Sequence, residues 1–198
     1  LGTPFAWGNQ NVFGGERENK SKAVFAQFTY KISDPLSFTA GYRHTWEEQS
    51  ITRAPRDRSV LLPRSVTAFA SLKVDKPSWT LSLDYKVNDD LLLYIAQRGS
   101  FRTAGYNIDN TVPDAQGRPS NNAYKTETTT DVEAGIKFAG DLGLVRSRLN
   151  LALYNQSVND IQRAVYLGIA AVTGNVDKAR IRGFEFDANF DISSNVEI

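Results

Sequence analysis

Apolar and polar residues alternate with a period of two along most of the chain. Phe38, Tyr42 and Trp46 occupy alternate positions, and Arg43 and Glu47 lie between them. Successive side chains of a β-strand point to opposite faces, so this pattern is typical of a strand with one apolar and one polar face. Six segments show it, at 24–30, 38–47, 79–87, 131–138, 148–153 and 184–192. Because no long stretch fits the 3.6-residue helical period, the pattern predicts an all-β fold.

The segment 91–102 is also strand-like, but its sequence does not indicate which face is which. Leu91 to Ile95 form an unbroken apolar run, so both faces of the strand are apolar there. We therefore leave the facing of this strand open.

The connections predict how the strands are arranged. Short connections are expected at 33–35, 88–90, 139–145 and 193–195, and long polar ones at roughly 50–78, 103–125 and 161–177, with 1–21 as a further loop. Alternating short and long connections place all the long loops at one end of an antiparallel sheet. This is the layout of an up-and-down transmembrane β-barrel.

Aromatic residues of the apolar face stand beside the expected short turns, at Tyr30, Phe38, Tyr85, Phe138 and Phe190. Aromatic rings favour the boundary between lipid and water. Eight residues separate Phe38 from Trp46, which corresponds to about 26 Å of strand and roughly 20 Å along the normal of a tilted barrel. That length fits the apolar band of an outer-membrane barrel.

The opposite face carries charges of both signs. Its members are Arg43, Glu47, Asp84, Lys86, Asp131, Glu133, Lys137, Arg148, Glu185 and Asp187. Such residues are costly in a dry core but suit a wet lumen or a lumen filled by a polar plug.

A soluble β-sandwich or lipocalin-like barrel would give the same alternation, with the apolar stripe facing inward. Long strands, asymmetric connections and rings at strand ends favour the membrane barrel. A sealed, water-soluble interior that buried Phe28, Leu83 and Ile136 together would contradict this interpretation.

Composition narrows the function classes. A net charge of +1 gives no basic stripe for nucleic acid, and the absence of cysteine excludes disulfides and thiolate metal sites. No apolar run reaches 18 residues, so no transmembrane helix is expected. The single histidine, His44, lies on the lipid-facing stripe near the outer rim, where we expect interface packing and not catalysis. We expect no enzyme activity, no catalytic residue, no metal site and no cofactor, and the lack of an initial methionine suggests a fragment or processed product.

Five segments, in order, resemble the TonB-dependent outer-membrane receptor family. They are Lys22–Tyr30 with Leu36–His44, Leu93–Tyr94 with Arg98–Asn107, Glu127–Lys137, Arg148–Gln162, and Ala179–Asp187. The second departs from the family pattern, because Ser100 separates Gly99 from Phe101 and Ala104 replaces a glycine. Together the segments span most of residues 22–192.

The resemblance implies a 22-stranded barrel around an N-terminal plug. Residues 1–198 would then form a partial barrel domain, an incomplete arc of about seven strands and the start of an eighth, without the plug or TonB box. An open arc leaves unpaired edges in lipid, so this piece alone is not expected to form a pore.

The function that the resemblance implies is active import across the outer membrane of a Gram-negative bacterium. The ligand would be scarce, with a ferric siderophore or another metal chelate as first choice, and the energy would come from the TonB complex through the missing plug. Outer-membrane lipid and lipopolysaccharide would surround the barrel. A passive porin-type channel and a soluble binding barrel remain the alternatives.

Two groups of candidate site residues follow. The outer loops offer possible ligand-binding residues, namely Arg102, Tyr106, Asn107, Arg56 and Arg58, although lipopolysaccharide contact or solvation would also explain them. The lumen face offers possible plug-facing residues, namely Arg43, Glu133, Gly135, Lys137, Gly183 and Glu185. Gly135 and Gly183 suit either close approach of a plug or relief of barrel curvature.

Overall fold

The computed structural model describes residues 12–56, 68–107, 112–113, 119–120, 123–167, 170–193 and 196–197. Its seven long strands are β1 (Val12–Lys31), β2 (Leu36–Arg56), β3 (Ala68–Lys86), β4 (Leu91–Arg102), β9 (Glu127–Leu142), β10 (Val145–Leu167) and β11 (Ala170–Ser193). Short strands are β5 (Gly105–Tyr106), β6 (Val112–Pro113), β7 (Pro119–Ser120), β8 (Ala123–Tyr124) and β12 (Val196–Glu197). In this part of the chain, no helix is long and apolar enough to cross a membrane.

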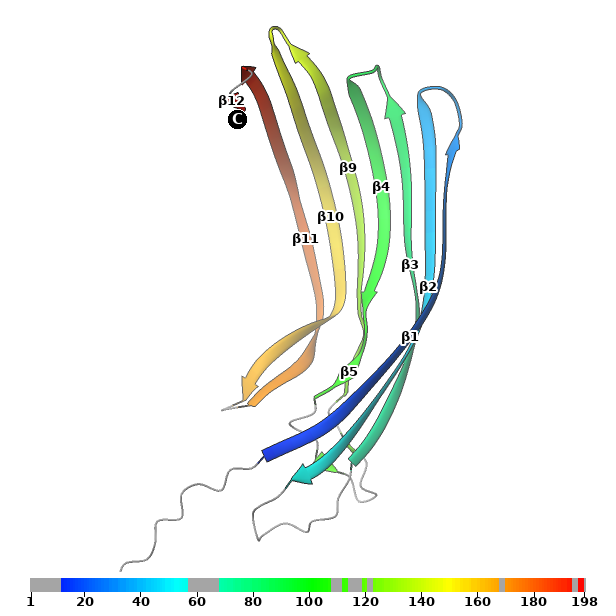
Figure 1. Cartoon of the computed structure of the whole chain (residues 1–198), viewed down its shortest axis with the longest axis vertical. Coiled ribbons are helices and arrows are strands. Elements are labelled where there is room, and N and C mark those ends of the chain that lie inside the picture. Colours follow the sequence, from blue (N-terminus) through cyan, green and yellow to red (C-terminus); the bar gives the residue numbers. More distant parts are fainter. Residues whose placement is uncertain are drawn as a thin grey trace, which may run out of the picture.

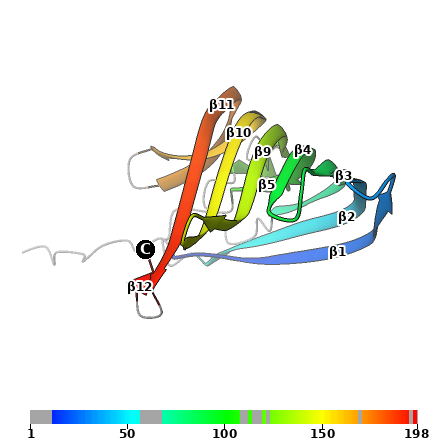
Figure 2. The ribbon, with the colours of Figure 1, turned by 90° about the horizontal axis from the view of Figure 1, so that it is seen from above.

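The long strands and β12 form one antiparallel sheet in the order β1-β2-β3-β4-β9-β10-β11-β12. Strands β5 to β8 lie in the connection between β4 and β9 and make two small two-stranded sheets. The large sheet curls into an open arc, with the short turns at one end and the long extensions at the other (Figures 1 and 2). The predicted all-β, up-and-down arc of seven strands is therefore confirmed.

The strand register aligns the apolar residues in continuous rows across the sheet. One row runs through Tyr30, Phe38, Leu83, Ile95, Ala134, Leu153 and Phe184. The side chains of this face are open to the surroundings, since Phe28 is 59% exposed, Leu83 38% and Ile136 43%. They do not meet in a sealed interior, as the soluble-barrel alternative would require.

The charged face is the concave one. Strand β5 lies inside the curve of the arc (Figure 2). Thr103, two residues before β5, donates its hydroxyl hydrogen to Glu47, so the face that carries Glu47 and Arg43 looks into the curve. We call this face the inner wall. The register also settles the facing of β4: Leu93 and Ile95 join the outer apolar rows.

Several predicted strand boundaries are wrong, and in each case the strand is longer than predicted. Residues 12–21 belong to β1 and not to a loop, and most of 161–177 belongs to β10 and β11, with only 168–169 between them. Between β2 and β3 the connection shrinks to 57–67. The sequences of these outer extensions mix polar and apolar residues without a period of two. Backbone hydrogen bonds to the neighbouring strand keep these segments extended, although their residues do not alternate between apolar and polar.

Candidate functional site: the inner wall and the mouth

A charge cluster occupies the middle of the inner wall, where β4 pairs with β9. Arg98 on β4 contacts two carboxylates of β9, with 2.8 Å from its Nη2 to Oδ2 of Asp131 and 2.5 Å to Oε2 of Glu133. The Tyr94 hydroxyl donates to Oε1 of Glu133 at 2.8 Å. Lys137 places its ammonium 5.2 Å from the centre of the Tyr94 ring, close enough for a cation–π contact. The cluster therefore joins two strands of the inner wall through opposite charges.

The two inner-wall glycines make room for tyrosine rings. A Cβ built on Gly135 would lie 2.5 Å from the Tyr94 ring, and one on Gly183 would lie 2.6 Å from the Tyr154 hydroxyl. Each tyrosine is the cross-strand neighbour of its glycine. Neither close approach of a plug nor curvature is needed to explain them, because the neighbouring ring already covers each glycine.

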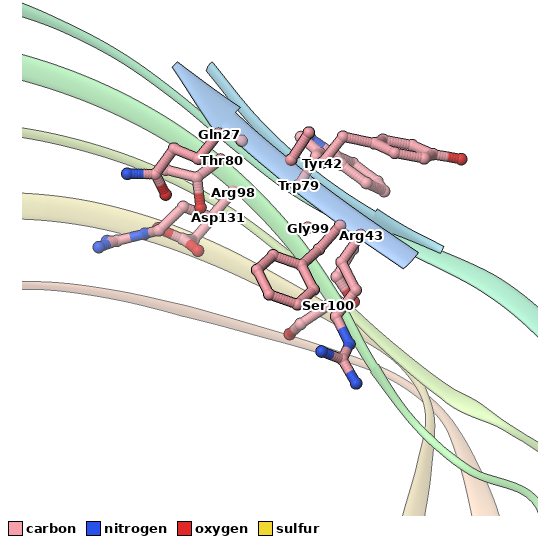
Figure 3. A pocket seen from close by; sticks show the side chains of 13 residues that line it. Gln27, Tyr42, Arg43, Trp79, Thr80, Arg98, Gly99, Ser100 and Asp131 are labelled. Carbon is pink, nitrogen blue, oxygen red and sulfur yellow. The ribbon is translucent and has the colours of Figure 1, made fainter. Parts of the chain in front are cut away.

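A shallow hollow of about 430 Å³ lies on the arc beside this cluster (Figure 3). Arg43, Arg98, Ser100 and Asp131 line it from the same side of the sheet, whereas Tyr42 points away on the other. The guanidinium of Arg43 donates to the Thr45 hydroxyl at 3.2 Å. A second hollow of about 400 Å³ adjoins it and shares Arg98 and Asp131. The inner wall thus offers charged hydrogen-bond donors, such as Arg43, and neutral ones, such as Ser100.

At the end of the arc with the long extensions, which we call the mouth, the sheet splits. The β3–β4 register ends at Trp79 and Gly99, although β3 continues to Ala68. The start of the β4–β9 connection is held against the first three strands. Arg17 of β1 donates to the carbonyl of Tyr106 at 2.8 Å, and the Tyr106 hydroxyl donates to the carbonyl of Ser71 in β3 at 3.1 Å.

The same connection is also held against β10 and β11. Asn107 and Thr173 exchange two hydrogen bonds, of 2.8 and 2.7 Å. Lys125 and Asn175 exchange two more, of 2.6 and 3.1 Å. The connection therefore crosses the mouth and is attached on both sides of the split.

The predicted ligand-binding residues end up in different roles. Arg102 is exposed, and its guanidinium makes no hydrogen bond or ion pair with any described residue. Tyr106 and Asn107 instead use their polar groups to hold the connection. Arg56 ends β2, but its side chain lies outside the described part, as does the whole of Arg58.

The predicted inner-wall residues are brought to one face. Arg43, Glu133, Lys137 and Glu185 all point into the curve, as the register requires. Sequence reasoning missed Arg98 and Tyr94, because they lie in the strand whose facing was open. It also missed Gln162 and Asn175, which fall in a segment interpreted as a loop.

His44 lies on the outer face, as predicted, with partners of its own. Its Nδ1 lies 3.0 Å from the Tyr42 hydroxyl, and its Nε2 contacts the Asp75 carboxylate. The imidazole also packs against Trp46, with 4.4 Å between ring centres. The histidine is one member of an aromatic row on the face that the apolar band occupies.

Trp79 lies nearby on the same face. Its indole lies over Gly99, which leaves no space for a Cβ there. Its Nε1 donates to the side-chain oxygen of Gln97 at 2.8 Å. The ring therefore has both its flat face and its polar edge occupied.

Solved structures with the same fold belong to larger receptors and transporters. The ferric yersiniabactin uptake receptor FyuA from Yersinia pestis matches with a TM-score of 0.70 and 20% identity over 92% of this chain and 26% of its own. The copper transporter OprC matches with a TM-score of 0.65 and 19% identity over 89% of this chain and 27% of its own. The ferric-catecholate import receptor Fiu from E. coli K12 matches with a TM-score of 0.63 and 15% identity over 91% of this chain and 26% of its own.

The present chain spans about a quarter of the length of these structures, and the likeness establishes a shared fold. The family model described as "TonB dependent receptor-like, beta-barrel" matches residues 2–197. That match covers nearly the whole chain, and its family is one of transport receptors. The chain belongs to the TonB-dependent receptor β-barrel family.

Proposed function

We propose that this chain is part of the barrel of an outer-membrane receptor that imports a scarce ligand with energy from TonB. One observation carries the proposal: a continuous antiparallel wall has an exposed apolar face outside and charges of both signs inside. A membrane-spanning barrel with a hydrated or plugged interior makes both faces favourable. The family match supports the receptor class.

The ligand that we propose is a ferric siderophore. Support comes from two proteins of similar structure, a ferric yersiniabactin uptake receptor and a ferric-catecholate import receptor. Arg102 is the described candidate contact, because its exposed guanidinium, unpaired within the described part of the chain, can bind an anionic chelate at the mouth. Arg56 and Arg58 stay candidates on sequence grounds.

The inner wall would face a plug domain in the full-length receptor. Arg43, Glu133, Lys137 and Glu185 are the proposed contacts, since charges of both signs can meet complementary groups on a polar plug. Gly135 and Gly183 leave this list, because tyrosine rings cover them. Lipid and lipopolysaccharide would surround the outer face, consistent with its exposed rings.

The test uses iron-starved Gram-negative cells that lack or carry the full-length receptor. The cells are given radioactive iron as catecholate, hydroxamate or phenolate chelates, or as haem. We expect saturable uptake of one chelate that disappears without TonB and drops when Arg102→Gln is introduced. Uptake that rises linearly with concentration and ignores TonB would instead identify a passive channel.

A further inference from the structure

The outer part of β10 has an open edge toward β9. The β9–β10 register ends at Thr128 and Asn159, yet β10 continues to Leu167. Beyond that point, the strand pairs with β11 alone among the strands that the structure describes. An open edge presents backbone groups that need partners, and here side chains supply them.

Gln162 is the central residue of this edge. Its amide nitrogen donates to the carbonyls of Thr103 at 2.8 Å and Lys125 at 3.0 Å, with a longer contact to Arg102 at 3.4 Å. Its backbone N–H donates to Oε2 of Glu127 at 2.6 Å. The residue is only 8% exposed, so water has little access to these bonds. One side chain therefore binds both ends of the β4–β9 connection.

Asn107 and Asn175 act in the same way at the neighbouring strand. Each exchanges two hydrogen bonds with the backbone of a residue far away in sequence, Thr173 and Lys125 respectively. Two reciprocal bonds are what a pair of facing residues makes in an antiparallel ladder. The side-chain amides thus take the place of peptide groups where the backbone ladder has ended.

A backbone irregularity at Asp160 of β10 accompanies this arrangement. Asn159 pairs with Lys178 and Ile161 with Val176, so the register is unchanged across Asp160, where the ladder is interrupted and φ is 51°. The carbonyl of Asp160 accepts from the amide of Asn175 at 2.7 Å. A positive φ turns the chain locally, and Figure 1 shows β10 and β11 bending in their outer parts.

We infer that Asn107, Gln162 and Asn175, which we call the amide brace, are positioning residues for the mouth. They hold residues 103–107 and 123–126 against the β10–β11 hairpin and so fix the backbone of Arg102. A cation on a fixed backbone binds without first ordering a loop, which improves affinity. The role of Arg102 rests on the proposed function, but the positioning by the brace does not.

The test replaces Gln162 in the full-length receptor by an isosteric residue that cannot donate. Gln162→Glu keeps the shape and the backbone N–H but removes all the side-chain donations. We expect backbone amides of 103–107 and 123–126 to exchange with deuterium roughly tenfold faster, as for the loss of one to two hydrogen bonds. Gln27→Glu, the same change on β1 away from the brace, should leave their exchange unaltered. Equal exchange in both variants would overturn the inference.

A second variant protects the test against misfolding. The chain has no cysteine, so Asn107→Cys with Thr173→Cys introduces a single possible disulfide within it and leaves Gln162 and Asn175 as the remaining members of the brace. Oxidation should link the pair readily, and roughly tenfold more slowly when Gln162→Glu is added, because the loop then leaves β11 more often. Exchange across 131–138 should stay slow in every folded variant. A linking rate independent of Gln162→Glu would contradict a shared brace.

The uptake assay separates this inference from the proposed function. With radioactive ferric catecholate, hydroxamate and phenolate chelates, Arg102→Gln and Gln162→Glu should each raise the concentration for half-maximal uptake, and the double variant should raise it no further. If none of the chelates is taken up while exchange still accelerates in Gln162→Glu, the transport proposal fails and the positioning role stands.

Discussion

The wall and the mouth are held together in different ways. In the wall, between the short turns and Trp79, backbone hydrogen bonds join all seven long strands. In the mouth, where β3 and β4 have separated, side chains connect the two parts of the sheet on either side of the split. In the wall, each strand pair shares a continuous register. In the mouth, the β3–β4 ladder has ended, and Tyr106, Asn107 and Gln162 span the split. The wall therefore tolerates side-chain change that respects its faces, while the mouth depends on a few particular amides.

The largest expected effect comes from a charged residue placed on the apolar outer face of the wall. Ile136→Arg places a charge on the apolar face and should cost about 2 to 4 kcal/mol of unfolding free energy. Ser82→Arg, on the inner wall, should cost far less because water or a plug can solvate the new charge. Denaturant titration of the full-length receptor in lipid vesicles measures both. Similar losses for the two variants would contradict the assignment of faces.

A smaller effect tests the tyrosine–glycine pairs of the inner wall. Gly135→Ala forces the Tyr94 ring away and weakens its bond to Glu133, which should cost about 1 to 3 kcal/mol. A Cβ added to Gly174, in the mouth, would meet no atom within 4 Å, so Gly174→Ala should stabilise by up to about 1 kcal/mol. Equal responses in the same denaturant titration would mean that the tyrosine rings do not pack over their glycines.

The smallest effect concerns the charge cluster. Arg98→Gln leaves Asp131 and Glu133 without their cation, but the Arg98 side chain is 42% exposed, so solvent screens the interaction. We expect a loss of about 1 kcal/mol that shrinks in high salt. Arg148→Gln is the control, since that exposed arginine has no ion pair among the described residues. A loss that is independent of salt would argue against an electrostatic origin.

Alternation of residues was sufficient to predict the wall. Phe28, Leu83 and Ile136 share a face because each lies at alternate positions of a strand, and pairing then aligns them. The facing of β4 could not be predicted, since Leu91 to Ile95 are apolar throughout. It is settled only by its neighbours, which place Tyr94 over Gly135 and Leu93 beside Ile136.

The mouth could not be predicted by the same means. The segments 12–21 and 161–177 lack a regular alternation of apolar and polar residues, although backbone pairing extends most of them as strands. The partner of Asn107 is 66 residues away and the contact is made by a side chain, so local pattern carries no sign of it. Candidate ligand contacts in such a segment are therefore separated from positioning residues only by the three-dimensional structure.

The indole of Trp79 can serve as a fluorescent probe of how deeply the outer face lies in the bilayer. Because its N–H is satisfied by Gln97 and its ring is covered on one side by the backbone at Gly99, few water molecules can relax around its excited state. Its emission should be blue-shifted and should be quenched by bromine atoms on acyl chains at the matching level of the bilayer. The bromine position that quenches the fluorescence most strongly would then give the vertical position of the barrel in the bilayer.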